Sequence, residues 1–167
     1  MIARIRALAT KTAAAKERLD MNEAIREVVA FAQDEVRRNN VILRVELADA
    51  LSPVLGDRVQ LQQVVLNLVT NGIEAMSSVE ERPRELIVRT QNDDAGQVRV
   101  TVQDSGKGLD PQSMERVFDA FYTTKHGGMG MGLSISRSII QHHEGRLWAV
   151  ANDGPGVSIQ FTVPKFH

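Results

Sequence analysis

Asp104 and the glycines after it combine residue types that suit the recognition of a purine base. Asp104 ends a segment, 98–104, that alternates apolar and polar residues, and Gly106 and Gly108 follow it closely. Glycine lets the backbone come very near a ligand, and a buried carboxylate accepts a hydrogen bond from an exocyclic amino group. Adenine offers such a group and guanine does not at that position. The pattern therefore predicts an adenine site, with an ordinary loop aspartate as the alternative.

A run of glycines further along the chain leads directly into an apolar helical pattern. Gly128, Gly130 and Gly132 alternate with methionines, and Leu133 follows. Bare N–H groups and the positive end of a helix can hold phosphate. The spacing fits neither a Walker loop nor the Rossmann fingerprint. The run predicts a hinge that also binds phosphate, and a plain flexible hinge is the alternative.

Polar residues also share one stripe of a helical segment upstream. At 100° per residue, Gln60, Asn67, Asn71 and Glu74 fall on one side of an apolar ridge. Asparagine is a poor helix former, and Mg²⁺ prefers oxygen ligands that include amide oxygens. The stripe favours a ligand role for these side chains, whereas most such stripes are solvated surface.

The elements that position these residues follow from periodicity and from turn signals. Asn22 is a candidate N-cap, and Asp57 with Gln60 resembles a capping box. The expected helices lie near 22–38, 57–76 and 130–143, and the expected strands are 41–47, 86–90, 98–104, 146–151 and 157–163. We predict an α+β fold: a two-layer α/β sandwich with a mixed sheet of about five strands and three helices on one face.

Composition excludes several functional classes. The chain has 167 residues, 43% of them hydrophobic, a net charge of −1 and no cysteine, which excludes disulfides and zinc–thiolate sites. The charge balance gives no reason to expect nucleic acid as a partner. No apolar run reaches the ~18 residues of a membrane helix, and the N-terminus lacks a secretory signal. We expect a cytoplasmic domain without membrane contact.

The three segments, in this order, resemble the ATP-binding catalytic domain of sensor histidine kinases, which belongs to the wider group that includes gyrase-type ATPases. The resemblance covers about residues 20–165. It implies that the chain binds ATP with Mg²⁺, that Asp104 reads the adenine amino group and that Asn71 coordinates the metal. Asn67 stands at the family's other asparagine of the same motif.

The resemblance also predicts a flexible ATP lid over residues 109–127. The segment 117–125 resembles the family's phenylalanine-containing box, in which Phe118 and Phe121 would anchor the lid and Lys125 would contact the terminal phosphate. The implied catalytic residues are Asn67, Asn71 and Lys125. The implied ligand-binding residues are Asn71, Glu74, Asp104, Gly106, Gly108, Thr124, Lys125, Gly128, Gly130, Gly132 and Leu133.

The phosphoryl acceptor is expected outside the catalytic domain. Related ATPases carry a water-activating glutamate where Asn67 stands, so transfer to a histidine is favoured over hydrolysis. The family's acceptor lies on a preceding helical hairpin that dimerises. Residues 1–19 are interpreted as the end of that hairpin and a linker, and 20–167 as the catalytic domain. The expected partners are this histidine-containing dimerisation domain and the receiver domain of a response regulator. His142 and His143, at a helix end, are expected at the surface.

Three alternatives remain open from the sequence. A serine-directed kinase of the anti-sigma type shares the fold group. A non-catalytic nucleotide-sensing module would bind ATP only to change a partner interface. A weak ATPase of the gyrase type is disfavoured by Asn67.

Overall fold

A five-stranded mixed sheet forms one layer of the molecule. The computed structural model describes residues 16–119 and 132–166. The strand order is β2-β4-β5-β7-β6, in which β2 and β4 run parallel and the other neighbours run antiparallel. The strands are β2 (Val41–Glu46), β4 (Arg84–Asp93), β5 (Gln97–Asp104), β6 (Arg146–Ala151) and β7 (Val157–Pro164).

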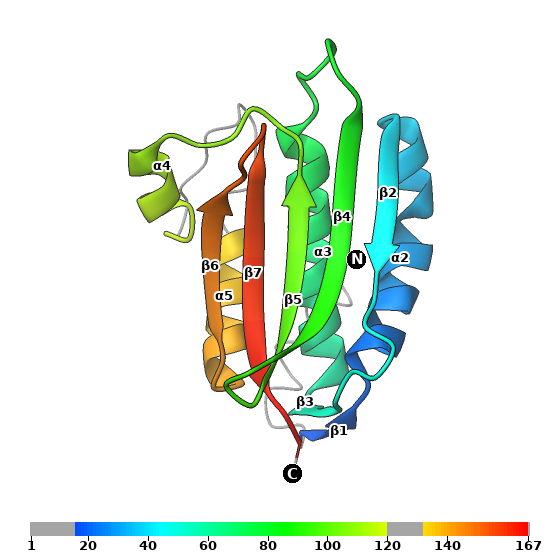
Figure 1. Ribbon diagram of the computed structural model, residues 1–167, viewed down its shortest axis with the longest axis vertical. Helices are drawn as coiled ribbons and strands as arrows, with labels where there is room; N and C mark the ends of the chain where they lie inside the picture. Colours follow the sequence, from blue (N-terminus) through cyan, green and yellow to red (C-terminus); the bar gives the residue numbers. More distant parts are fainter. Residues whose placement is uncertain (1–15, 120–131, 167) are drawn as a thin grey trace.

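Helices cover one face of this sheet (Figure 1). They are α2 (Met21–Arg38), α3 (Arg58–Ala75) and α5 (Gly132–His142), and a short helix, α4 (Pro111–Arg116), follows β5 and projects from the sheet. Apolar side chains of the helices meet the inward side chains of the strands in one buried core, which includes Leu68, Val100 and Phe161. The predicted two-layer α+β fold is confirmed.

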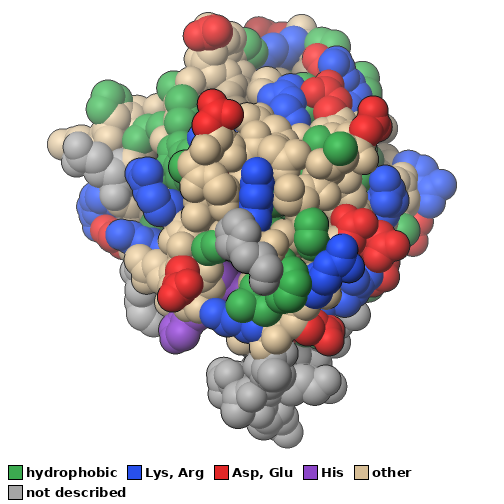
Figure 2. Space-filling view, turned by 60° about the horizontal axis from the view of Figure 1, so that its bottom comes forward, with side chains coloured by type: hydrophobic (Ala, Val, Ile, Leu, Met, Phe, Trp, Pro, Cys, Tyr) green, Lys and Arg blue, Asp and Glu red, His purple; other side chains and the backbone are tan. Residues whose placement is uncertain are grey.

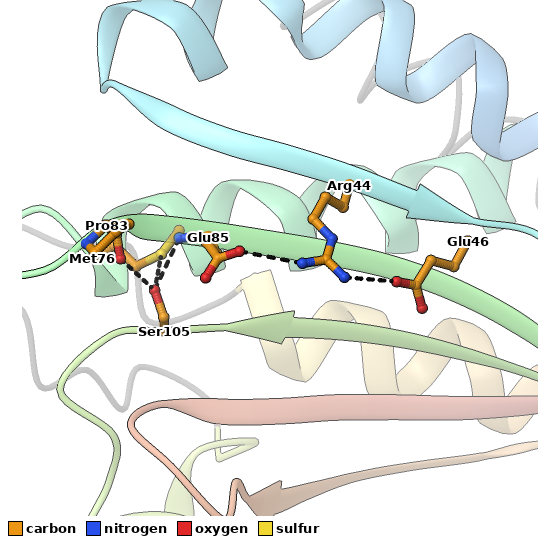
Figure 3. Close-up of polar contacts among 6 residues, drawn as sticks. All are labelled: Arg44, Glu46, Met76, Pro83, Glu85 and Ser105. Carbon is orange, nitrogen blue, oxygen red and sulfur yellow. Dashed lines mark hydrogen bonds and ion pairs between the residues drawn. The ribbon is translucent and has the colours of Figure 1, made fainter.

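The opposite face of the sheet carries polar side chains. Arg44 forms ion pairs with Glu46 at 3.3 Å and with Glu85 at 3.4 Å across β2 and β4 (Figure 3). Hydrogen bonds from Arg89, which has the larger effect, and from Arg44 lower the pKa of Glu46. Exposed pairs of this kind add little stability. Their effect is to keep the uncovered face of the sheet compatible with water.

A small two-stranded sheet lies at one end of the molecule and was not expected from the sequence. β1 (Glu17–Leu19) pairs antiparallel with β3 (Val54–Gly56), and Leu19 and Val54 are buried. Basic and acidic side chains are interspersed on the face shown in Figure 2, which includes this end. The division of the chain at residue 19 stays a prediction, since residues 1–15 lie outside the described part.

The N-cap of α2 differs from the predicted one, whereas that of α3 was predicted correctly. Asp20, not Asn22, caps α2: its carboxylate accepts the Asn22 N–H at 2.9 Å. Asn22 is buried, and its side chain donates to the Ala48 carbonyl and accepts from the Thr90 hydroxyl. Asp57 caps α3 by accepting the Gln60 N–H at 3.1 Å, as expected. The Asp57 N–H, which a capping box would bond to a side chain of the same helix, is bonded by the His143 ring instead.

Within the described residues, none of the helices is both long enough and apolar enough to cross a membrane.

Candidate functional site

Asp104 lies at the end of β5, and the fold buries its carboxylate. The residue is 5% exposed, and its Oδ1 accepts the Gly106 N–H at 2.9 Å and the Val157 N–H at 3.3 Å. Two backbone donors on one oxygen fix the plane of the carboxylate. A carboxylate held in this way can present an acceptor to a ligand without rearranging when the ligand arrives.

The turn between β6 and β7 contacts Asp104, a contact that was not predicted from the sequence. Asn152 donates its side-chain N–H to the Asp104 carbonyl at 2.8 Å. A Cβ on Gly156 would lie 2.1 Å from that carbonyl oxygen, and Gly156 has a φ of +94°. Only glycine fits such a position without strain. The sequence 152–156 was interpreted solely as a hairpin turn, so its contribution to the site was missed.

The turn that follows Asp104 is held from the other side by residues near the start of β4. The Ser105 hydroxyl accepts the Glu85 N–H at 2.9 Å and donates to the Pro83 carbonyl at 3.2 Å (Figure 3). Arg82 donates to the carbonyls of Ser105 and Gly106 at 3.0 and 2.8 Å. Ser105 and Arg82 were also missed, since the partners named here lie at least 20 residues away and leave no local signal.

Helix α3 runs beside this carboxylate at its C-terminal half. A Cβ on Gly72 would lie 3.6 Å from the Asp104 Cβ, and one on Gly106 would lie 2.5 Å from the Ala75 carbonyl oxygen. Asn71, next to Gly72, is half-buried, whereas Glu74 is exposed. The structure therefore brings Asn71, Asp104 and Gly106 to one end of the molecule. Gly108 lies in the same turn with a φ of +79°.

Asn67 connects α3 to the first turn of α5. Its Nδ2 donates to the Gly132 carbonyl at 3.2 Å and to the Ser136 hydroxyl at 3.1 Å, and its Oδ1 accepts from Gln63 at 2.7 Å. Because a carbonyl can only accept, the amide nitrogen must face Gly132. The side-chain amide of Asn67 thus links α3 to α5.

The start of α5 carries the last residues of the glycine run. The helix begins at Gly132, and Leu133 is 7% exposed and packs in the core. The site residues Thr124, Lys125, Gly128 and Gly130, and also Phe121, lie outside the described residues. Their predicted roles stay predictions.

The described part of the predicted lid packs on the core. Leu109, Met114, Val117 and Phe118 are half-buried against it. Asp110 caps α4 by accepting the Ser113 N–H at 2.7 Å. Phe118 thus lies where a lid anchor was expected, and the flexibility of the lid stays a prediction.

The expectation that His142 and His143 both lie at the surface is wrong for His143. His142 is exposed, whereas His143 is 2% exposed, because the last turn of α5 presents it to the start of α3. Among the described residues, no group of three or more His, Cys, Asp or Glu side chains is placed to hold a metal ion. A metal near Asn71 would thus draw its remaining ligands from the bound molecule and from water.

Known proteins share both the sequence and the fold. Sensor protein FixL of Bradyrhizobium diazoefficiens is 39% identical over 98% of this chain, which spans about a third (32%) of FixL. The catalytic domain of histidine kinase ThkA is 34% identical with a TM-score of 0.79, over 90% of this chain and 95% of that domain. The structure of histidine kinase ThkA in complex with response regulator protein TrrA is 32% identical with a TM-score of 0.76, over 90% of this chain and 42% of that one.

A protein-family model also matches this chain. The model described as "Histidine kinase-, DNA gyrase B-, and HSP90-like ATPase" matches residues 56–167, a range that includes both Asp104 and α3. The match extends over more than half of the chain. The chain belongs to the family of histidine kinase-, DNA gyrase B- and HSP90-like ATPases.

Proposed function

We propose that this domain binds Mg²⁺·ATP and transfers the γ-phosphoryl group to a histidine on a dimerisation domain of its parent protein. The observation that carries the proposal is the buried Asp104 carboxylate, held by two backbone N–H groups beside α3 and the turn of Gly106 and Gly108. The similarity to FixL and to the ThkA catalytic domain supports a role in two-component signalling.

Asp104 is the proposed selector of the base. Its Oδ1 is oriented by Gly106 and Val157, so the carboxylate has one orientation in which to accept the adenine amino group. Gly106 and Gly108 let the backbone approach the base edge. Guanine carries an oxygen where adenine carries the amino group, and an oxygen facing a carboxylate is repulsive.

Asn71 is the proposed protein ligand of Mg²⁺. Its side chain supplies an amide oxygen on the half-buried stripe of α3, and Mg²⁺ accepts one or two protein oxygens with phosphate and water as the rest. When bound, Mg²⁺ neutralises charge on the phosphates and orients them. Glu74, exposed one turn later, is proposed to line the same edge of the site.

The start of α5 is the proposed phosphate site. The backbone N–H groups of Gly132 and Leu133 open the helix, and Gly128 and Gly130 of the same glycine run are proposed to add further N–H groups to the phosphate. Thr124 and Lys125 would contact the terminal phosphate, where a lysine offsets charge that develops during transfer. A neutral imidazole nitrogen of the acceptor forms the P–N bond as the bond from phosphorus to the ADP oxygen breaks. The acceptor then loses its ring proton to solvent.

Asn67 is proposed to position groups and not to move a proton. An amide cannot take a proton at neutral pH, and the three hydrogen bonds of Asn67 join α3 to the start of α5. The site then lacks a base at this position, which disfavours hydrolysis and suits an acceptor that needs little deprotonation.

The proposed partners are the histidine-containing dimerisation domain and a response regulator receiver domain. The complex of ThkA with TrrA supports the second. We propose that the domain works in the cytoplasm, without contact with nucleic acid or membrane.

Transfer of labelled phosphate tests the proposal. The chain alone should not label itself and should hydrolyse ATP slowly. Addition of the dimerisation hairpin from the parent protein should give acid-labile labelling of the hairpin histidine. Positioning supplies much of the rate in phosphoryl transfer, so the isolated pocket loses most of it.

Variants make this test specific to the site. Asn71→Ala and Lys125→Ala should each reduce labelling at least tenfold, whereas Lys165→Ala, which removes a lysine at the far end of β7, should not. Acid-stable labelling of the chain itself would contradict the proposal and favour a serine-directed kinase. Nucleotide binding without any labelling would favour a non-catalytic sensing module.

A further inference from the structure

His143 is buried at the junction of α5, α3 and β3, and both of its ring nitrogens make hydrogen bonds. Nδ1 lies 2.8 Å from the Ile139 carbonyl, and Nε2 lies 3.0 Å from the backbone nitrogen of Asp57. A carbonyl only accepts and an amide N–H only donates, so Nδ1 carries the proton and Nε2 accepts. The ring is therefore a neutral imidazole in a single tautomer.

The contact with Asp57 completes the cap of α3. The Asp57 carboxylate accepts the Gln60 N–H, and its own N–H is satisfied by His143. In a capping box a side chain of the same helix makes this second bond. Here His143, the residue after α5, supplies it from 86 residues further along the chain. Gly56 leaves the room for it, since a Cβ there would lie 3.3 Å from the His143 ring.

A second polar contact joins the same two helices near the start of α5. Asn67, ten residues after Asp57, donates to the Gly132 carbonyl and the Ser136 hydroxyl. The two helices run antiparallel, so one contact lies at each end of α5. Two directional contacts, one at each end of α5, oppose both sliding and rotation of this helix against α3.

We propose that His143 is a positioning residue, which accepts the Asp57 N–H and thereby holds α5 in the register that places Gly132 opposite Asn67. The consequence for nucleotide binding rests on the proposed function. The register itself does not, because it concerns only contacts within the chain.

The charge state of His143 should control this contact. Burial lowers the pKa of His143, and the hydrogen bond to Ile139 opposes that effect. The titratable groups that act on the ring are Lys16, Asp57 and His142. Protonation would place an N–H at Nε2 against the N–H of Asp57. Two donors repel each other, so the imidazolium cannot make the contact.

Two variants and one control separate positioning from simple burial. In His143→Leu the site stays filled by an apolar side chain, and the Asp57 N–H loses its acceptor. In His143→Gln the side-chain oxygen can reach the position of Nε2 and accept again. His142→Leu is the matched control, since His142 makes the same local contact, Nδ1 to the Ser138 carbonyl at 2.8 Å, but is exposed.

Nuclear magnetic resonance of the full chain without nucleotide gives the first readout. In the parent chain, the ¹⁵N shift of His143 Nε2 should be that of an unprotonated nitrogen at pH 7. In His143→Leu, the Asp57 amide should exchange at least tenfold faster, and the Asn67 side-chain amide and Gly132 signals should move. His143→Gln should return these signals toward their parent positions, and His142→Leu should leave them unchanged.

Calorimetry with Mg²⁺·ATP gives the second readout. His143→Leu should weaken binding at least threefold, and His143→Gln should bind within twofold of the parent chain. If His143→Leu does not fold, the ¹⁵N shift and the His143→Gln comparison decide the matter. If the variants show the predicted signal changes but the parent chain binds no nucleotide, the proposed function is contradicted while the role of His143 in the helix register stands.

The pH dependence gives a third readout with a defined sign. Because the folded pKa lies below the ordinary value of 6.5, the unfolded chain binds more protons between the two values. The contribution of His143 to stability is complete above 6.5 and is lost as the pH falls through the folded pKa. His143→Gln should lack this loss. The proposal would be overturned if the parent chain and His143→Gln showed the same dependence of stability on pH. It would also be overturned if the signals of Asn67 and Gly132 did not change in His143→Leu.

Discussion

Helix α3 has a buried titratable side chain near each end, and the two are held in different ways. Asp104 lies beside Gly72 and Ala75, near the end of the helix, whereas His143 lies at its N-cap. Loops hold Asp104, through the turns that contain Gly106 and Gly156. Ends of regular elements hold His143, through the last turn of α5 and the first turn of α3.

This difference indicates that the two ends of α3 serve different purposes. Loops rich in glycine permit a close approach by a ligand but contribute few buried contacts of their own. Helix ends joined by directional bonds resist displacement. The Asp104 end is suited to binding, and the His143 end is suited to keeping the helices that carry Asn67 and Gly132 in place.

The largest expected effect comes from Gly156→Ala, which breaks the Asp104 end. The new Cβ would lie 2.1 Å from the Asp104 carbonyl oxygen at a φ of +94°. Overlap with backbone and positive φ together should lower the free energy of unfolding by about 3 kcal/mol. Urea denaturation measures the change.

Gly154→Ala is the matched control in the same turn. A Cβ on Gly154 meets no described atom within 4 Å, so its effect should stay within about 0.5 kcal/mol. Equal losses in the two variants would show that the turn, and not the approach of Gly156 to Asp104, limits stability.

A smaller effect of opposite sign is expected at the His143 end from Glu144→Gly. Gly145 donates its N–H to the Ile140 carbonyl at 2.9 Å and Glu144 has a φ of 60°, a helix end at which glycine usually takes the left-handed position. Relief of that conformation should raise the free energy of unfolding by about 1 kcal/mol, or the melting temperature by about 2–4 °C.

Asn40→Gly sharpens this expectation. Asn40 also has a positive φ, 55°, but asparagine tolerates it, so the gain should be only a few tenths of a kcal/mol. A gain at Asn40 as large as that at Glu144 would argue against local strain at the end of α5.

The place of Asp104 at the end of a strand, before a turn, could be predicted because its signals are local. The role of Asp104 in binding stays a prediction. An aspartate at a strand end with glycines two and four residues later is visible within a short window, as is the periodicity of the helices that meet there. The polar stripe of Gln60, Asn67, Asn71 and Glu74 was also visible in the sequence, and Asn67 makes its contacts with Gly132 and Ser136 from that stripe. Its role in ligand binding stays a prediction.

The His143 end was missed because its partners are remote in sequence. Asp57 lies 86 residues from His143, and periodicity cannot reveal a bond between two helix ends. The predicted N-cap of α2 was wrong for a related reason. Asn22 is a good capping residue, but its side chain is buried and accepts a hydrogen bond from Thr90, 68 residues away. The pairing of β1 with β3 depends on a similar long-range contact.

Calorimetric titration of the full chain with ATP and with GTP, each with Mg²⁺, tests most directly the claim that Asp104 recognises adenine. The account predicts that ATP binds more than tenfold tighter than GTP. It also predicts that Asp104→Asn weakens ATP binding more than tenfold, since a charge-assisted hydrogen bond contributes about 1.5–3 kcal/mol. The asparagine must direct its one oxygen to the Gly106 and Val157 N–H groups, so a donor replaces the second carboxylate oxygen. Equal affinities for ATP and GTP in the parent chain would contradict the account.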